Sequence, residues 1–106
     1  MTELLLGIDI GTTNVKAVLS TPEGLIIGQA QTAYPTYRPK PGWAEQDPKD
    51  WWRTTVEVTR EVLKNGPARP EQIAAIGVSG QGCAVTLIDE VGEVIRPAII
   101  WMDMRS

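Results

Sequence analysis

The chain has 106 residues, of which 42% are hydrophobic and 22% charged, which suits one small soluble domain with a modest core. Its net charge of −3 comes from interspersed acids and bases, so a nucleic-acid partner is not expected. No apolar run approaches the roughly 20 residues that cross a bilayer, and no basic signal-peptide region precedes residue 4. The single cysteine excludes an intrachain disulfide and fits a cytoplasmic protein. Histidine is absent, which removes the commonest general base.

The first third of the chain predicts three strands. Residues 4–10 form a nearly continuous apolar run, which is typical of a strand buried on both faces. Residues 11–13 break this run as a tight turn, and residues 15–19 predict a second strand. The Thr-Pro-Glu-Gly sequence at 21–24 predicts another turn, followed by a third strand over residues 25–32. Together these segments predict a three-stranded antiparallel meander.

A helix is predicted to follow the irregular, proline-rich residues 34–47. Asp47 is a good N-cap and Pro48 suits the first helical position. The Asn-Gly-Pro sequence at 65–67 predicts the end of the helix. The stripe at helical spacing, which predicts the buried face, consists of Trp52, Val56, Thr59 and Leu63.

The remaining segments complete an α/β domain. Residues 73–79 predict an apolar strand that ends at Gly-Gln-Gly, and residues 85–89 and 94–95 flank a turn at 90–92. Residues 98–101 form the last apolar run. This order of elements predicts an α/β layered domain with a mixed sheet. Because the chain stops a few residues after that run, we expect it to be a fragment of a longer protein.

Asp9 is unusual because it lies in an otherwise apolar strand, where an unpaired buried charge is costly. One interpretation is a carboxylate that hydrogen-bonds a nearby turn. The other is a role beside bound phosphates, which a carboxylate would repel unless a cation lay between them. That second interpretation predicts Mg²⁺ near Asp9, held through water because magnesium loses its hydration shell reluctantly.

The residues after Asp9 favour an anion site. Gly11 lets the backbone turn sharply and approach a ligand, while Thr12, Thr13 and Asn14 offer hydroxyls, an amide and backbone N–H groups in one turn. Lys16 has two interpretations, either a phosphate ligand on the same side of the strand or an ordinary exposed lysine.

Four blocks of the sequence resemble the FGGY family of carbohydrate kinases. GIDIGTTN at 7–14 resembles the first phosphate motif of the actin and heat-shock-chaperone ATPases, and the following Val-Lys-Ala-Val is similar to its FGGY form. The other blocks are PGWAEQDP at 41–48 with two tryptophans after it, IGVSGQ at 76–81 and RPAIIWMDMR at 96–105. They occur in the family's order across the whole chain, and the overall pattern is most similar to the xylulokinases of that family.

The resemblance implies a ribonuclease-H-like, actin-like ATPase fold: an α/β domain whose mixed sheet opens with the three-stranded meander. Residues 1–106 would form the N-terminal portion of the first kinase domain, without the rest of that domain or the second domain. The family transfers the γ-phosphoryl group of ATP to a sugar or polyol hydroxyl, which implies ATP and Mg²⁺ as cofactors. Because the family's catalytic aspartate would lie beyond residue 106, we expect no catalytic residue in the chain and no turnover by the chain alone.

Two sets of site residues follow from the loop chemistry and the resemblance. The predicted cofactor-binding residues are Asp9, Gly11, Thr12, Thr13, Asn14 and Lys16, with Asp9 near the metal. The predicted substrate-binding residues are Gln81, Gly82, Cys83, Trp101, Asp103 and Arg105. Three of these have structural alternatives, namely a small buried apolar residue for Cys83, core packing for Trp101 and a surface ion pair for Arg105.

The substrate is less sharply predicted. In the family that the chain resembles, many xylulokinases have methionine and histidine at the positions of Gly82 and Cys83. Glycerol kinases have arginine and glutamate there. This chain has neither pair. D-xylulose or a related ketose is the favoured substrate, with gluconate, erythritol or another polyol as alternatives. Rival classes are a non-catalytic actin- or chaperone-like ATP-binding module and a stand-alone interaction module. No membrane partner is expected, and a homodimeric parent protein is in keeping with the family.

Overall fold

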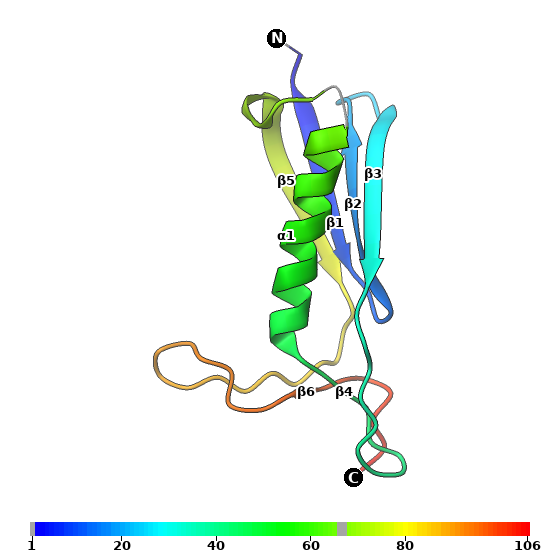
Figure 1. Cartoon of the computed structure of the whole chain (residues 1–106), viewed down its shortest axis with the longest axis vertical. Coiled ribbons are helices and arrows are strands. Elements are labelled where there is room, and N and C mark those ends of the chain that lie inside the picture. The colour runs from blue at the N-terminus through cyan, green and yellow to red at the C-terminus, as the bar shows by residue number, and fades with distance from the viewer. Residues whose placement is uncertain (1, 66–67) are drawn as a thin grey trace.

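The computed structural model describes residues 2–65 and 68–106. One helix lies against a four-stranded sheet, and a pair of two-residue strands lies beyond the end of that sheet (Figure 1). The elements in chain order are β1 (Leu4–Ile10), β2 (Asn14–Ser20), β3 (Ile26–Ala33), β4 (Glu45–Gln46), α1 (Pro48–Asn65), the short 3-10 helix η1 (Pro70–Gln72), β5 (Ile73–Gly80) and β6 (Ala98–Ile99).

The main sheet has the strand order β3-β2-β1-β5. β1 pairs antiparallel with β2 and parallel with β5, and β2 pairs antiparallel with β3. This arrangement confirms the predicted meander and the mixed sheet. The register places Asp9 of β1 between Lys16 of β2 and Ser79 of β5, so these three residues share one face of the sheet.

Helix α1 packs on the opposite face, mainly over β2 and β3. Its fully buried residues are Thr54, Val58 and Val62. The predicted buried stripe is wrong, because Val56, Thr59 and Leu63 are only partly buried and Trp52 is 72% exposed. Thr54 replaces it because its hydroxyl donates to the Asp50 carbonyl at 2.7 Å, which satisfies the polar group inside the helix.

A glycine lets the helix lie close to the sheet. A Cβ at Gly28 would lie 3.3 Å from the Val62 Cγ2 atom, so a side chain there would push α1 away from β3. At the start of the helix, the Asp47 carboxylate accepts from the Lys49 N–H at 2.9 Å, as the sequence predicts for an N-cap. The helix ends at Asn65, and the predicted stop residues 66–67 lie outside the described residues.

The sheet is covered unevenly. The prediction that residues 4–10 are buried on both faces is wrong, since Leu4 and Leu6 are buried while Gly7 and Asp9 are exposed. Residues 74–80 of β5 are exposed throughout. The cause is the position of α1, which covers the β2–β3 side of one face, while no described element covers the other face (Figure 1).

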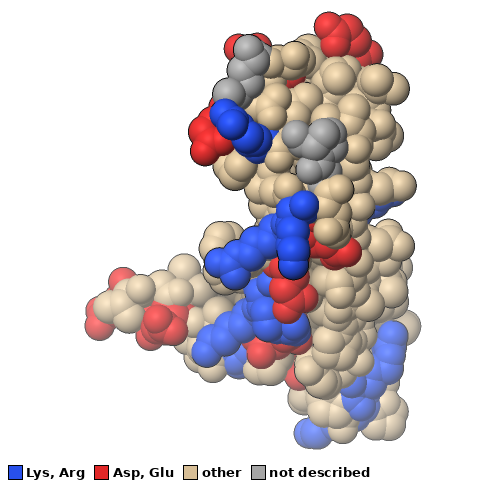
Figure 2. All heavy atoms as spheres, turned by 45° about the horizontal axis from the view of Figure 1, so that its top comes forward, with Lys and Arg blue, Asp and Glu red and all other residues tan. Residues whose placement is uncertain are grey.

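Residues 82–97 form an arm that projects from the sheet (Figure 1). The predicted strands at 85–89 and 94–95 are reduced to isolated bridges, one of them between Ile88 and Val94. The predicted turn is present: the Gly92 N–H donates to the Asp89 carbonyl at 3.1 Å, and Gly92 has φ +88°. In the view of Figure 2, acidic side chains lie on this projection, and basic and acidic side chains are mixed over the rest of the face.

Candidate functional site

The loop between β1 and β2 is a tight, supported turn. The Gly11 N–H donates to the Asn14 carbonyl at 2.9 Å. A Cβ at position 11 would lie 3.2 Å from that same Asn14 oxygen, so any side chain there would crowd the close turn. The buried Tyr34 hydroxyl donates to the Gly11 carbonyl and lies 3.2 Å from the Asn14 carbonyl.

Tyr34 remains a donor over the whole physiological pH range. Burial of its ring and the nearby negative charge of Asp9 raise the pKa of Tyr34 to about 12. The Tyr34 backbone N–H also donates to the Thr13 carbonyl at 3.2 Å. The loop is therefore held by Tyr34, directly after β3, as well as by its own strands.

Asp9 lies on the open face of the sheet, where the expectation of a buried aspartate is wrong. With Lys16 and Ser79 it lines a pocket of about 450 Å³, where Gly7 of β1 and Gly77 of β5 place no side chain over the backbone. Lys16 is exposed and lies on the same face as Asp9, directly opposite it in the register. This face offers a carboxylate, an ammonium group and a hydroxyl next to the 11–14 loop.

Gln46 of β4 lies at the centre of a hydrogen-bond network on the other side of the loop. It is fully buried, and its Nε2 donates to the Thr12 carbonyl at 2.6 Å and to the Thr36 hydroxyl at 3.0 Å. Its Oε1 accepts from the Trp51 indole at 2.9 Å and from the Gln81 amide at 2.7 Å. One side chain thus ties the loop to α1 and to the end of β5.

Gln81 follows directly after β5 and faces the same loop. Its backbone N–H donates to the Ile10 carbonyl at 2.9 Å, and its Nε2 lies 3.5 Å from the Gly11 carbonyl. Gln81 lines a small pocket of about 180 Å³ that also contacts Trp51. Its Oε1 is buried and has no hydrogen-bond partner within the described part of the chain.

Trp101 brings the last sequence block to the loop. Its indole N–H donates to the Thr12 hydroxyl at 2.8 Å, although the two residues are 89 positions apart. The ring is 56% exposed, so core packing is the wrong interpretation of Trp101. The residues predicted to contact sugar and the residues predicted to contact phosphate therefore meet at this hydrogen bond.

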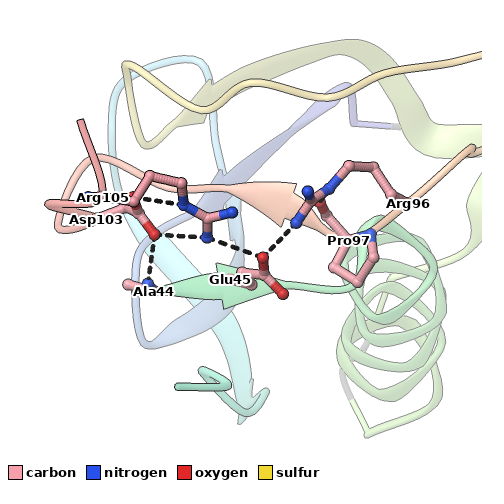
Figure 3. Close-up of polar contacts among 6 residues, drawn as sticks. All are labelled: Ala44, Glu45, Arg96, Pro97, Asp103 and Arg105. Carbon is pink, nitrogen blue, oxygen red and sulfur yellow. Dashed lines mark hydrogen bonds and ion pairs between the residues drawn. The ribbon is translucent and has the colours of Figure 1, made fainter. Parts of the chain in front are cut away.

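A cluster of ion pairs fastens the segment that carries Trp101. The Glu45 carboxylate lies between Arg96 and Arg105, and the Arg105 Nη2 lies 2.8 Å from Glu45 Oε2 (Figure 3). Arg105 also makes a bidentate pair with Asp103, at 2.8 and 2.7 Å. The Asp103 carboxylate in turn accepts from the Ala44 N–H at 2.7 Å.

The Asp103–Arg105 pair is enclosed and strongly coupled. Hydrogen bonds from the Arg105 side chain, together with the Ala44 and Arg105 backbone N–H groups, hold the pKa of Asp103 well below its usual range. The Asp103 side chain is only 4% exposed, and Arg105 stacks 3.6 Å above the Trp43 ring centre. Both oxygens of Asp103 are occupied within the chain, so the geometry favours a fastening role for the pair over direct sugar contact.

Gly82 and Cys83 lie at the base of the arm. Both are exposed, and Cys83 has φ +54°, a left-handed conformation that is uncommon for a residue with a side chain. The interpretation of Cys83 as a buried apolar residue is therefore wrong. A Cβ at Gly82 would meet no atom within 4 Å, so the space beside it is open.

A family model matches this arrangement over nearly the whole chain. Residues 4–106 match the N-terminal domain of the FGGY family of carbohydrate kinases. The chain belongs to the FGGY family. Its sheet order and covering helix are those of the family's actin-like ATPase fold, as the sequence blocks predict.

Individual FGGY relatives carry different substrate names. The chain is 38% identical to a glycerol kinase of Methylobacterium nodulans, over 100% of the chain and 21% of that protein. It superimposes on a xylulose kinase of Rhodospirillum rubrum with TM-score 0.90 and 34% identity, covering 97% of the chain and 21% of that structure. A gluconate kinase of Lactobacillus acidophilus gives TM-score 0.88 and 28% identity, covering 97% and 20%. The chain thus spans about a fifth of the length of the relatives it matches.

Sequence reasoning missed three residues that organise this FGGY site. The sequence indicates Glu45 and Gln46 only as part of the block at 41–48, and it does not indicate Tyr34. The sequence signal for Glu45 and Gln46 is their position. They are two polar residues between apolar Trp43-Ala44 and the helix cap Asp47, which makes them candidates for a buried network. Nothing in the sequence places Tyr34 under the loop.

Within the described residues, no helix is long and apolar enough to cross a membrane, and no three potential metal ligands cluster.

Proposed function

We propose that residues 1–106 are the N-terminal portion of a longer FGGY kinase that transfers a phosphoryl group from ATP to a sugar hydroxyl. The observation that carries this proposal is the Trp101–Thr12 hydrogen bond of 2.8 Å. It joins the segment expected to bind the acceptor to the loop expected to bind the phosphates. Phosphoryl transfer depends on holding its two reactants together and on neutralising charge.

The donor set of the loop suits a magnesium nucleotide. Asp9 presents an exposed carboxylate beside an open pocket, and oxygen donors are what magnesium and its bound waters prefer. Because the Trp101 indole can only donate, Thr12 Oγ1 accepts from it, which leaves the Thr12 hydroxyl proton for a phosphate oxygen. Thr13, Asn14 and the Lys16 ammonium would add further donors. When bound, magnesium ATP supplies the phosphoryl group and neutralises its charge.

The acceptor side is formed by exposed groups around Trp101. Its ring offers a flat wall for the C–H faces of a sugar, and Gln81, which precedes the exposed Gly82 and Cys83, lies beside the loop that Trp101 contacts. Asp103 and Arg105 position the Trp101 segment through their contacts with Ala44 and Glu45. D-xylulose or a related open-chain ketose is the proposed substrate. It is supported by the likeness to the xylulose kinase structure, and gluconate and short polyols are the second candidates.

A substrate panel tests this proposal on the full-length gene product. With ATP and Mg²⁺, the account expects kcat/KM to be highest for ketoses among ketoses, polyols and aldonates. Asp9→Asn removes the charge that attracts the cation and is expected to lower kcat by at least about 100-fold. Trp52→Phe is the control, because Trp52 is exposed and outside the site. A strong preference for glycerol would overturn the ketose assignment.

A further inference from the structure

We propose that Gln46 is a positioning residue, which sets the conformation of the 11–14 loop and the direction of the Gln81 side-chain amide. The inference rests on the proposed function for its kinetic consequences, but its structural content does not. Gln46 is fully buried, and both its amide nitrogen and its carbonyl oxygen make two hydrogen bonds. A buried amide whose own nitrogen and oxygen are both bonded favours one orientation, because another would leave these groups unpaired.

The chemistry of its neighbours fixes which way the Gln46 amide points. The Trp51 indole can only donate, so it must meet the Gln46 carbonyl oxygen, at 2.9 Å. The Thr12 carbonyl can only accept, so it must meet the Gln46 NH₂ group, at 2.6 Å. A reversed amide would place the Gln46 NH₂ group against the Trp51 N–H and the Gln46 oxygen against the Thr12 carbonyl. The orientation of Gln46 therefore follows from its partners.

The direction of the Gln81 amide follows from that of Gln46. Because Gln46 Oε1 is an acceptor, Gln81 must turn its NH₂ group toward it, at 2.7 Å. The Gly11 carbonyl, 3.5 Å from the same nitrogen, favours the same orientation. The Gln81 Oε1 is then left as a buried acceptor with no partner among the described residues. A ligand group that reaches this oxygen must be a donor, which selects a hydroxyl and disfavours a carboxylate.

Gln46→Glu tests the positioning role, because it keeps the size and the Oε1 acceptor but replaces the NH₂ donor. The new carboxylate oxygen would face the Thr12 carbonyl and repel it, so the 11–14 loop must shift. Gln72→Glu is a matched control, since Gln72 also donates to a backbone carbonyl, that of Thr2 at 3.0 Å, but far from the loop. Trp51→Phe is a second variant, which removes the indole donor that orients Gln46 and keeps an aromatic ring, although smaller, against the core.

The kinetic measurement uses the full-length gene product. Gln46→Glu is expected to raise KM for ATP by about 10-fold or more, because a hydrogen bond to the loop is replaced by repulsion. Gln72→Glu is expected to keep the wild-type KM for ATP. Trp51→Phe is expected to change KM for ATP in the same direction by a smaller factor. If folded Gln46→Glu keeps the wild-type KM for ATP and loses only thermal stability, Gln46 is merely structural and the inference is wrong.

A second measurement separates this inference from the proposed function. In ¹⁵N NMR spectra of the 106-residue chain, the Gln46 side-chain amide protons should exchange slowly with solvent. Gln46→Glu should shift the backbone amides of Thr12, Thr13 and Gln81, and Trp51→Phe should shift the Gln46 side-chain amide. An inactive wild-type gene product would overturn the proposed function, while these shifts would still support Gln46 positioning. Fast exchange of the Gln46 amide, or an unchanged loop in both variants, would overturn the inference.

Discussion

Strand β2 and the edge strand β5 differ sharply in how they bury apolar side chains. Under α1, Val15, Ala17 and Leu19 of β2 are 0% exposed. On β5, Ile76 is 60% and Val78 69% exposed, although both are as apolar as the residues of β2. The sheet therefore has a well-packed core around β2, whereas β5 presents apolar surface of the kind that marks an interface.

The arm extends this contrast beyond the sheet. Val91 is 77% and Ile95 62% exposed on a segment held mainly by isolated bridges. The loop end of the molecule, by comparison, buries polar residues that bond one another, with Gln46 and Glu45 as the centres. This chain therefore organises its loop by itself, while β5 and the arm present apolar surface that further residues of the proposed longer kinase would cover.

The largest expected effect separates the two sides of the sheet directly. Leu19→Ala should lower the free energy of unfolding by about 3 kcal/mol, because it leaves a cavity beneath α1. Ile76→Ala removes a similar volume from an exposed position and should change it by less than about 0.5 kcal/mol. Urea denaturation of the 106-residue chain measures both. Equal losses in the two variants would mean that β5 is as well packed as β2.

The next effect depends on the length of the protein. Ile76→Lys should have almost no effect on the stability of the 106-residue chain, because its side chain already meets solvent. In the full-length gene product the same substitution should cost at least about 2 kcal/mol, because the lysine would be buried beneath a covering segment. Thermal denaturation of the two lengths in parallel makes the test, and Leu25→Lys on an exposed turn serves as control. A harmless lysine at both lengths would contradict the idea of a cover.

The ion-pair cluster at the loop end should respond to acid. The folded chain holds the pKa of Asp103 below the unfolded value of about 3.9, so the folded state favours the charged form. Its contribution to stability is therefore fully present above about pH 4 and is lost as the pH falls toward the lower, folded-state pKa. Denaturation midpoints measured from pH 5 down to pH 2 should fall more steeply for wild type than for Asp103→Asn. Parallel pH profiles would show that the carboxylate is not held in this way.

The smallest effect concerns the start of the covering helix. Asp47→Ala removes the cap on the Lys49 N–H, a hydrogen bond of 2.9 Å, and should lower the stability of the chain by about 1 kcal/mol. Asp47→Asn keeps an acceptor oxygen and should restore most of that loss. Helix content by circular dichroism should fall only slightly in the alanine variant. A loss as large as that of Leu19→Ala would mean that capping, rather than burial, holds α1 in place.

Local chemistry made much of this fold predictable. Turn residues, the Asp47 cap and short apolar runs act within a few positions, and from them the meander, the helix and β5 are predicted correctly. The buried helix stripe failed because tertiary packing, not residue size, selected Thr54 over Trp52. The predicted burial of Asp9 and β5 is wrong because burial depends on which segments cover the sheet. A strand's own sequence does not contain that information.

The candidate site shows the same limit. The loop residues can be proposed as site residues from the sequence, because neighbouring glycine, hydroxyl and carboxylate groups indicate phosphate chemistry, and Trp101 can be proposed from the resemblance of its block to the family. The role of Gln46 depends on contacts with Thr12, Thr36, Trp51 and Gln81, which come from separate parts of the chain. Only the folded arrangement brings those partners to one side chain.

The most direct test of the account is phosphoryl transfer by two proteins of different length in one assay. With ATP, Mg²⁺ and a ketose, the full-length gene product should form sugar phosphate, and the 106-residue chain should form none. This result would agree with a chain that supplies the phosphate loop and part of the sugar site but not the catalytic base. Turnover by the 106-residue chain, or no transfer to any sugar by the full-length product, would contradict the account.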